Sequence, residues 1–245
     1  MHQLHHGDAL SLLSTLDAGT VDAVITDPPY NSGGRTTGER TTNSARGKYV
    51  SSDAKHTLAD FGGDSRDQRS YTHWLTLILT ECLRVSREGA AALVFTDWRQ
   101  LPTTSDALQA AGWTWRGVVV WHKLIARPRR GGFSQNTEYL LWGSNGPVLA
   151  DRNPVCLPGL VSGSQPRGDA RQHITQKPVD VMRQLVQICP PGGTVLDPFA
   201  GAGTTGVAAL TEGRRFVGIE LSEHYHSVAA QRLSDSDSPD LDRED

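Results

Sequence analysis

The chain has 245 residues, 37% of them hydrophobic, and a formal net charge of −3, so its length suits one α/β domain or a domain with one large insertion. No apolar run approaches the roughly 20 residues of a membrane span, and the N-terminal residues lack a secretory signal pattern, so a cytoplasmic location is predicted. The three cysteines, Cys82, Cys156 and Cys189, are far apart and form no CxxC pair, which argues against a disulfide framework or a zinc cluster and predicts no metal.

The acidic excess is concentrated at the C-terminal end, where six acids stand against Arg243 in residues 233–245. Without that segment the chain is slightly basic, and residues 121–171 carry a local excess of Arg and Lys. Because DNA-binding proteins usually present a basic surface, the net charge alone does not exclude DNA as a partner. Contacts with DNA are expected in the basic segment.

Short apolar runs rich in β-branched residues alternate with longer helical patterns, which is typical of a mainly parallel sheet covered on both faces. The class is therefore α/β, with seven strands. The predicted strands are Gln3–His5, Val21–Ile25, Ala91–Thr96, Trp115–Trp121, Tyr139–Trp142, Thr194–Leu196 and Arg215–Ile219. The predicted helices are Ala9–Leu16, Tyr71–Ser86, Trp98–Ala111, Val179–Ile188, Thr204–Thr211 and Ser222–Leu233.

Three segments depart from this alternation. Residues 31–70 are polar and too long for an ordinary connection, which predicts a mobile loop beside the site. Residues 126–176 are rich in Pro, Gly and Arg and predict an inserted target-recognition region. Residues 234–245 alternate Ser and Asp and predict a disordered tail. One domain then has a catalytic half at 1–125 and a cofactor-binding half at 177–233.

A glycine turn joins the predicted strand Thr194–Leu196 to the predicted helix Thr204–Thr211. Gly201 and Gly203 let the backbone turn tightly and approach a ligand closely. Together with Gly206 they also satisfy the G-x-G-x-x-G spacing of dinucleotide-binding folds. The glycines alone therefore leave a nicotinamide dinucleotide open as the ligand.

Two acids near this turn favour a different cofactor. Asp197, at the strand end, would repel a pyrophosphate but suits the cationic amino-acid part of S-adenosylmethionine. Glu220, at the end of the next predicted strand, would accept hydrogen bonds from ribose hydroxyls. A plain strand-turn-helix with packing glycines is the alternative.

The tetrapeptide Asp27-Pro28-Pro29-Tyr30 follows a buried strand, where α/β sheets place their ligands. The prolines fix the backbone, so Asp27 and a proline carbonyl can hold an amino group with its lone pair facing a methyl donor. Tyr30 can stack on a base that has left the duplex. The alternative is an ordinary Pro-Pro turn after a strand. These four residues are the catalytic candidates.

The tetrapeptide, followed later by the segment Asp197-Pro198-Phe199-Ala200-Gly201-Ala202-Gly203-Thr204-Thr205, resembles the β group of amino-directed DNA methyltransferases, in which the catalytic motif precedes the cofactor motif. The resemblance spans nearly the whole chain. It implies a circularly permuted, seven-stranded, Rossmann-like methyltransferase sheet with helices on both faces. It also implies that Lys177-Pro178 is the group's K-P element, which flanks the methionine part of the cofactor.

The resemblance further implies that the N-terminal strand completes the sheet and that Asp8 lies near the cofactor's adenine. Asp8 could instead cap a helix, and Lys177 could be an ordinary helix-start residue. With S-adenosyl-L-methionine as cofactor, the binding candidates are Asp8, Lys177, Asp197, Pro198, Phe199, Gly201, Gly203, Thr204, Thr205 and Glu220.

With Asp as the first residue of the tetrapeptide, this sequence resembles the N6-adenine enzymes, whereas N4-cytosine members of the group more often carry Ser at that position. The predicted activity is methyl transfer to adenine N6 in double-stranded DNA. Cytosine N4, an amino group in RNA or protein, and a non-catalytic DNA-binding role are the alternatives. The residues do not decide between monomer and homodimer, or whether a restriction endonuclease accompanies the enzyme.

Arginine can bridge phosphates or read guanine edges, and the alternative for such a cluster is a solvated charged loop. The DNA-binding candidates are Arg127, Arg129, Arg130, Arg152, Arg167 and Arg171. Four tryptophans fall in or beside predicted strands and are expected to be core and sheet residues. They are Trp113, Trp115, Trp121 and Trp142.

Overall fold

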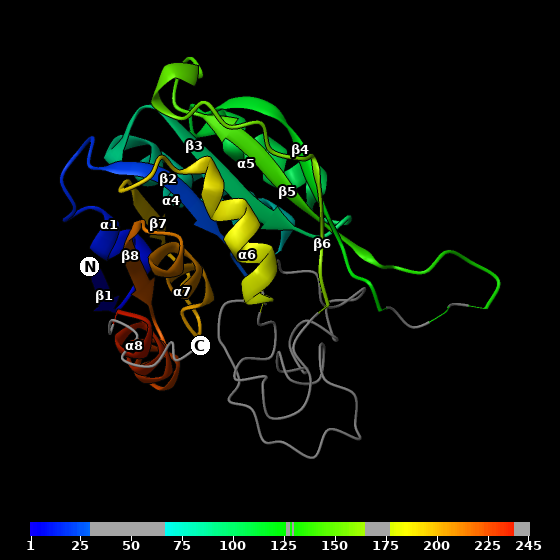
Figure 1. Cartoon of the computed structure of the whole chain (residues 1–245). Helices are drawn as coiled ribbons and strands as arrows, with labels where there is room; N and C mark the ends of the chain where they lie inside the picture. Colours follow the sequence, from blue (N-terminus) through cyan, green and yellow to red (C-terminus); the bar gives the residue numbers. More distant parts are fainter. Residues whose placement is uncertain (30–66, 126–127, 129, 165–176, 238–245) are drawn as a thin grey trace, which may run out of the picture.

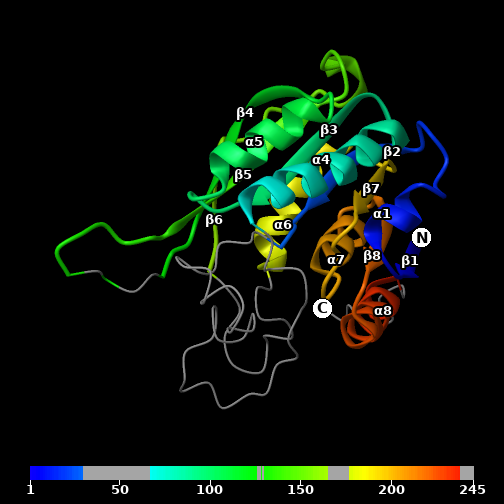
Figure 2. The ribbon, with the colours of Figure 1, turned by 180° about the vertical axis from the view of Figure 1, so that it is seen from behind.

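The computed structural model describes residues 1–29, 67–125, 128, 130–164 and 177–237. Over these ranges, one sheet of eight strands lies between two layers of helices (Figure 1 and Figure 2). Each helical layer buries a separate apolar cluster against one face of the sheet. The α/β class predicted from the sequence is confirmed.

The strands of the sheet are β1 (His2–His6), β2 (Val21–Thr26), β3 (Ser86–Thr96), β4 (Thr114–His122), β5 (Thr137–Ser144), β6 (Leu160–Ser162), β7 (Thr194–Asp197) and β8 (Arg215–Glu220). They lie in the order β1-β8-β7-β2-β3-β5-β4-β6. The strands from β1 to β3 in that order are mutually parallel, and β5 is antiparallel to both β3 and β4. All six residues of β2 are buried, as a central strand covered on both faces requires.

The N-terminal strand completes the sheet beside the last strand of the chain. In the parallel pairing of β1 with β8, Gln3 lies opposite Val217 and His5 opposite Ile219. This pairing confirms the circular permutation that the sequence predicted.

In the part of the chain that the structure describes, two groups of three α-helices cover the sheet. The helices are α1 (Ala9–Leu13), α4 (Gln68–Val85), α5 (Leu101–Ala110), α6 (Val179–Leu185), α7 (Thr204–Thr211) and α8 (Glu223–Asp237). Helices α1, α4 and α5 pack on one face, and α6, α7 and α8 pack on the other (Figure 1 and Figure 2). Helix α4 illustrates why these segments form helices that pack on the sheet. Its buried residues recur every three or four positions and so lie on one face, and the Asp67 side chain caps its N-terminus.

The sheet has one strand more than the seven predicted. Residues Leu160–Ser162 form β6, which pairs in parallel with Val120–His122 of β4. A strand this short in a Gly-rich and Pro-rich stretch carries no alternating pattern, so only its pairing reveals it. Strands β5 and β6 both lie within residues 126–176, so the predicted insertion contributes part of the sheet itself.

Helix α8 extends to Asp237 and is longer than the predicted helix, which ended at Leu233. The first residues of the predicted disordered tail are therefore helical, and Ser236 Oγ donates to the Arg232 carbonyl at 2.8 Å. Residues 238–245, like most of the predicted loop 31–70, lie outside the described residues. Among the helices of the described part, none has the length and apolar content needed to cross a membrane.

The four tryptophans lie in the core or on the sheet, as expected: Trp115 and Trp121 lie on β4, Trp142 lies on β5, and Trp113 directly precedes β4. Trp113 and Trp121 are buried, and their indole N–H groups donate to the carbonyls of Leu79 and Gly163 at 2.9 and 3.0 Å. Trp115 is exposed.

Candidate active site

The predicted catalytic tetrapeptide begins where β2 ends. Because β2 is buried along its whole length between β7 and β3, Asp27 follows a rigidly held element. Asp27 and Pro29 are half-buried and Pro28 is buried, whereas Tyr30 lies outside the described residues. The tetrapeptide thus starts at the carboxyl edge of the parallel strands of the sheet, where α/β proteins bind ligands.

Asp197 connects this strand to the glycine turn. Its carboxylate accepts hydrogen bonds from Thr26 Oγ1 at 2.8 Å, Thr205 Oγ1 at 2.6 Å and the Phe199 backbone N–H at 3.0 Å. Burial raises the pKa of Asp197 to about 6, in opposition to these hydrogen bonds, which lower it. The carboxylate therefore holds the catalytic and cofactor motifs together, and its direct contact with a cofactor stays a prediction.

The glycine turn has the geometry that its sequence requires. Gly201 and Gly203 have φ values of 53° and 76°, in the left-handed region that favours glycine. Helix α7 begins at Thr204, as predicted. Glu220, at the end of β8, accepts hydrogen bonds from the backbone N–H groups of Gly201 at 2.8 Å and Ser222 at 2.7 Å. Burial raises the pKa of Glu220. This acid thus lies directly against the turn.

Pro198 and Phe199 connect the turn to α4. Pro198 is buried and Phe199 is half-buried. The Phe199 ring packs on Trp74 of α4, with 5.4 Å between the ring centroids. This side of the turn is therefore apolar and packed against a long helix.

Asp8 caps α1, which was the alternative considered from the sequence. One of its carboxylate oxygens accepts from the backbone N–H and the hydroxyl of Ser11, both at 3.0 Å. The preceding Gly7 N–H donates to the Glu220 carbonyl at 2.9 Å, so Asp8 follows directly on the pairing of β1 with β8. Its predicted contact with the cofactor's adenine stays a prediction.

Lys177 reaches the catalytic tetrapeptide. Its Nζ lies 2.5 Å from Asp27 Oδ2 and 3.2 Å from Glu138 Oε2. Burial lowers the pKa of Lys177, but the attraction of Asp27 and then of Glu138 outweighs burial, so the pKa is raised. The ammonium group is therefore held as a cation between two carboxylates. Its predicted place beside the cofactor's methionine part stays a prediction.

Glu138 and Lys123 are residues that the sequence analysis did not select. They lie at the adjoining ends of β5 and β4, where the register places Glu138 opposite Trp121, and Lys123 Nζ contacts a carboxylate oxygen of Glu138. The only sequence signal for Glu138 was its acidic side chain near the start of a mainly apolar strand. Its contact with Lys177 depends on the tertiary structure.

Arg152, one of the predicted DNA-binding residues, makes contacts within the protein. Its guanidinium donates to Asp22 Oδ1 at 2.5 Å and to the Glu88 carbonyl at 2.7 Å. Asp22 is buried near the amino end of β2, opposite to Asp27, and also pairs with Arg87 at 2.6 Å. This position favours a structural role for Arg152. Arg130 is exposed, and Arg127, Arg129, Arg167 and Arg171 lie outside the described residues.

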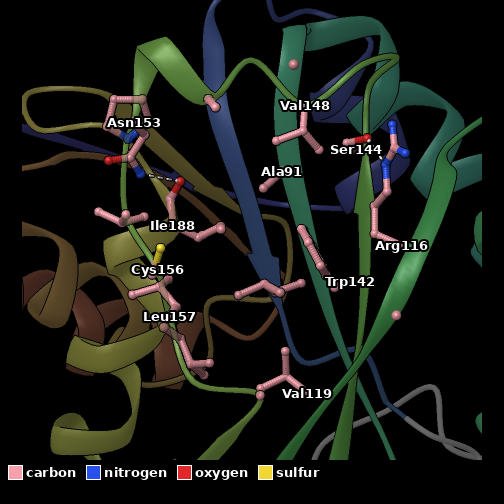
Figure 3. A pocket seen from close by; sticks show the side chains of 18 of the residues that line it. Ala91, Arg116, Val119, Trp142, Ser144, Val148, Asn153, Cys156, Leu157 and Ile188 are labelled. Carbon is pink, nitrogen blue, oxygen red and sulfur yellow. Dashed lines mark hydrogen bonds between the residues drawn. The ribbon is translucent and has the colours of Figure 1, made fainter.

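A cavity of about 630 Å³ lies on the α6 side of the sheet. Figure 3 shows its mainly apolar lining, formed by strands on one side and the chain around Val148–Leu157 on the other. Asn153 Nδ2 anchors that chain by donating to the carbonyls of Gln187 and Ile188, both at 2.9 Å. Arg152 lines this cavity and Asp27 does not, so the cavity is separate from the candidate active site.

Comparison with known proteins gives consistent matches over most of the chain. The DNA methylase family N6_N4_Mtase matches residues 21–154 and 156–231. The protein YubD of Escherichia coli (strain K12) is 32% identical over 237 residues, covering 96% of this chain and 91% of that protein. Type II methyltransferase M.HinfI of Haemophilus influenzae is 26% identical over 250 residues, covering 93% of this chain and 67% of that protein.

Solved structures share the fold. The crystal structure of the M1.HpyAVI complex with S-adenosylmethionine superposes with a TM-score of 0.67 at 24% identity, covering 95% of this chain and 99% of that one. The PvuII DNA methyltransferase, described as cytosine-N4-specific, has a TM-score of 0.69 at 16% identity, covering 95% of this chain and 86% of that one.

Proposed function

This chain belongs to the amino-directed N6/N4 DNA methylase family, and we propose that it methylates the N6 amino group of adenine in DNA. Membership of this family shows the general activity: the chain is a DNA methyltransferase whose methyl donor is S-adenosyl-L-methionine. The observation that supports adenine is Asp27, which heads the tetrapeptide where β2 ends, because the N6-adenine members that this chain resembles carry Asp there.

The residues around the glycine turn suit this cofactor. Glu220 presents a half-buried carboxylate that can accept hydrogen bonds from ribose hydroxyls. The glycines of the turn at 199–203 would let a ligand approach the backbone closely. Asp197 adds negative charge for a cationic amino acid and holds the turn through its three hydrogen bonds. When bound, the cofactor supplies a methyl group activated by its sulfonium sulfur.

Asp27 and the prolines act on the target amino group. The carboxylate and a proline carbonyl each accept a hydrogen bond from one N–H of the amino group. These two hydrogen bonds turn the nitrogen lone pair out of conjugation with the ring and toward the methyl group. The new N–C bond replaces the S–C bond of the methyl donor, the nitrogen then has one proton to lose, and Asp27 is the proposed acceptor of that proton. Tyr30 is proposed, from its place in the sequence, to stack on the extruded base.

The connection between β4 and β5 is the proposed DNA contact. Strand β4 runs parallel to β3 and β2, because β5 is antiparallel to both β3 and β4, so this connection leaves the sheet at the same edge as Asp27. Its described residues extend away from the body of the molecule (Figure 1 and Figure 2). Arg130 and Phe133 are exposed there, and the Arg130 guanidinium suits contact with DNA phosphates.

Substitution of two arginines to alanine is expected to separate a DNA contact from a structural contact. Arg130→Ala should weaken DNA binding similarly for all sequences and reduce the slope of log affinity against log salt by about 1. Arg152→Ala should leave DNA affinity unchanged but lower the free energy of unfolding by about 1–3 kcal/mol, because the buried Asp22 loses one of its two arginine partners and keeps Arg87 and the Thr194 backbone N–H. Fluorescence anisotropy across a salt series and urea unfolding measure the two effects. If Arg152→Ala lost DNA affinity but kept normal stability, Arg152 would be assigned a role in DNA binding.

The modified base can be identified directly. DNA incubated with the protein and S-adenosyl-L-methionine is expected to yield N6-methyladenine on nucleoside mass spectrometry. N4-methylcytosine is the competing product, since a neighbour in fold, the PvuII enzyme, is cytosine-N4-specific. Detection of N4-methylcytosine without N6-methyladenine would overturn the adenine proposal and leave the family assignment intact. Parallel reactions with RNA and with protein test the other amino-group substrates.

A further inference from the structure

Four charged side chains of alternating sign form a line that ends at the catalytic tetrapeptide. Lys123 contacts Glu138, Glu138 contacts Lys177 at 3.2 Å, and Lys177 contacts Asp27 at 2.5 Å. The four residues come from four separate places in the chain: the ends of β2 and β4, the start of β5, and the segment before α6. We refer to them as the charge line.

The inner members of the charge line are costly to bury. The side-chain exposure is 7% for Lys177 and 13% for Glu138. Lys177 Nζ lies 4.8 Å from the Phe95 ring centroid and 5.9 Å from that of Trp121, so aromatic faces surround the ammonium where water would otherwise solvate it. Charges in such surroundings persist only when opposite charges compensate them.

Stability alone does not account for this arrangement. Hydrophobic residues of similar volume often replace buried ion pairs without loss of stability. The charge line also runs to the carboxylate that the proposed mechanism uses, and Lys177 contacts one specific oxygen of it, Oδ2. A carboxylate held at one oxygen cannot rotate freely. Correct orientation of a reacting group can lower the activation free energy of a reaction substantially.

We propose that Glu138 is a positioning residue for methyl transfer, which holds Lys177 so that Lys177 fixes the orientation of the Asp27 carboxylate toward the target amino group. This inference rests on the proposed catalytic role of Asp27. Glu138 touches neither the base nor the cofactor in this scheme. Lys123 contacts the carboxylate of Glu138 at the outer end of the line and limits its movement.

The charge line also predicts a pH signature. Among the residues that the structure describes, the charged groups in contact with Lys177 include Asp27 after β2 and Glu138 on β5, with Lys123 behind Glu138. Burial works against the charged form of Lys177, and both carboxylates work in favour of it. Removal of the Glu138 charge leaves the burial and removes part of the attraction, so Lys177 should lose its proton at lower pH.

Glu138→Gln is the central test. Its kcat should fall by about 10- to 100-fold, its KM values for DNA and cofactor should stay within about twofold, and the alkaline limb of its pH profile should move to lower pH. Glu81→Gln is the matched control, since Glu81 pairs with Arg84 on α4, three residues along the same helix, and should behave as wild type. Lys123→Met should show a smaller loss than Glu138→Gln.

Two further variants keep the result interpretable. If Glu138→Gln does not fold, the double variant Glu138→Gln/Lys123→Met removes one charge of each sign and carries the same prediction. Asp27→Ala is measured in parallel. An inactive Asp27→Ala beside a Glu138→Gln variant with wild-type kcat and an unmoved alkaline limb would overturn this inference alone. An active Asp27→Ala would overturn the proposed mechanism together with it.

Discussion

Asp27→Ala is expected to lower the rate of methyl transfer by about 10³-fold while cofactor affinity stays close to that of the wild type. The carboxylate leaves the carboxyl end of β2, whereas the glycine turn is held by Asp197 and Glu220. Loss of Asp27 therefore removes the acceptor for the target amino group and keeps the residues around the turn. Single-turnover transfer from labelled cofactor measures the rate, and calorimetry measures the affinity.

A second variant tests whether the loss reflects chemistry or a disturbed charge. Asp27→Ala removes one of the two carboxylates that neutralise the buried Lys177, which itself costs stability. The double variant Asp27→Ala/Lys177→Met removes the charge as well, so its stability should recover in part while transfer stays absent. Recovery of transfer in the double variant would mean that the unbalanced charge, and not the missing acceptor, caused the loss.

Asp197→Ala is expected to weaken cofactor binding by about 10- to 100-fold, with a smaller effect on transfer at saturating cofactor. The Asp197 carboxylate holds Thr26, Thr205 and the Phe199 N–H, and hydrogen bonds to a charged group contribute about 1.5–3 kcal/mol each. Without them the turn loses its fixed geometry. Thr205→Val removes one of the three bonds and should weaken binding less. If Asp197→Ala bound cofactor normally but transferred no methyl group, the cofactor-binding role assigned to Asp197 would be wrong and a catalytic role would replace it.

The same carboxylate makes cofactor binding depend on pH. Burial raises the pKa of Asp197 to about 6, so the group becomes protonated and loses its negative charge as the pH falls through that value. Cofactor affinity of the wild type should therefore decrease below about pH 6. Asp197→Asn carries no charge at any pH, and its weaker affinity should stay constant over the same range. Calorimetric titrations at several pH values distinguish these outcomes.

The sheet and helices were predictable because their signals are local. The apolar run that predicted a strand at Val21–Ile25 forms β2 at Val21–Thr26, and α7 spans Thr204–Thr211 as predicted. Strand β6 at Leu160–Ser162 carried no such signal, and its three residues are ordered as a strand by pairing with β4. Local pattern therefore predicts an element only where burial repeats along several consecutive residues.

The candidate site divides in the same way. The sequence by itself determined the family resemblance, the cofactor type and the two motifs, because the tetrapeptide after β2 and the glycine turn after β7 are contiguous stretches with distinctive residues. Only the tertiary structure decided that Arg152 pairs with Asp22 at the far end of the sheet and that Lys177 and Glu138 reach Asp27. Lys177 and Asp27 are 150 positions apart, and contacts over such separations depend on how the strands are ordered across the sheet. The pattern of residues that are neighbours in the sequence does not show the order of the strands across the sheet.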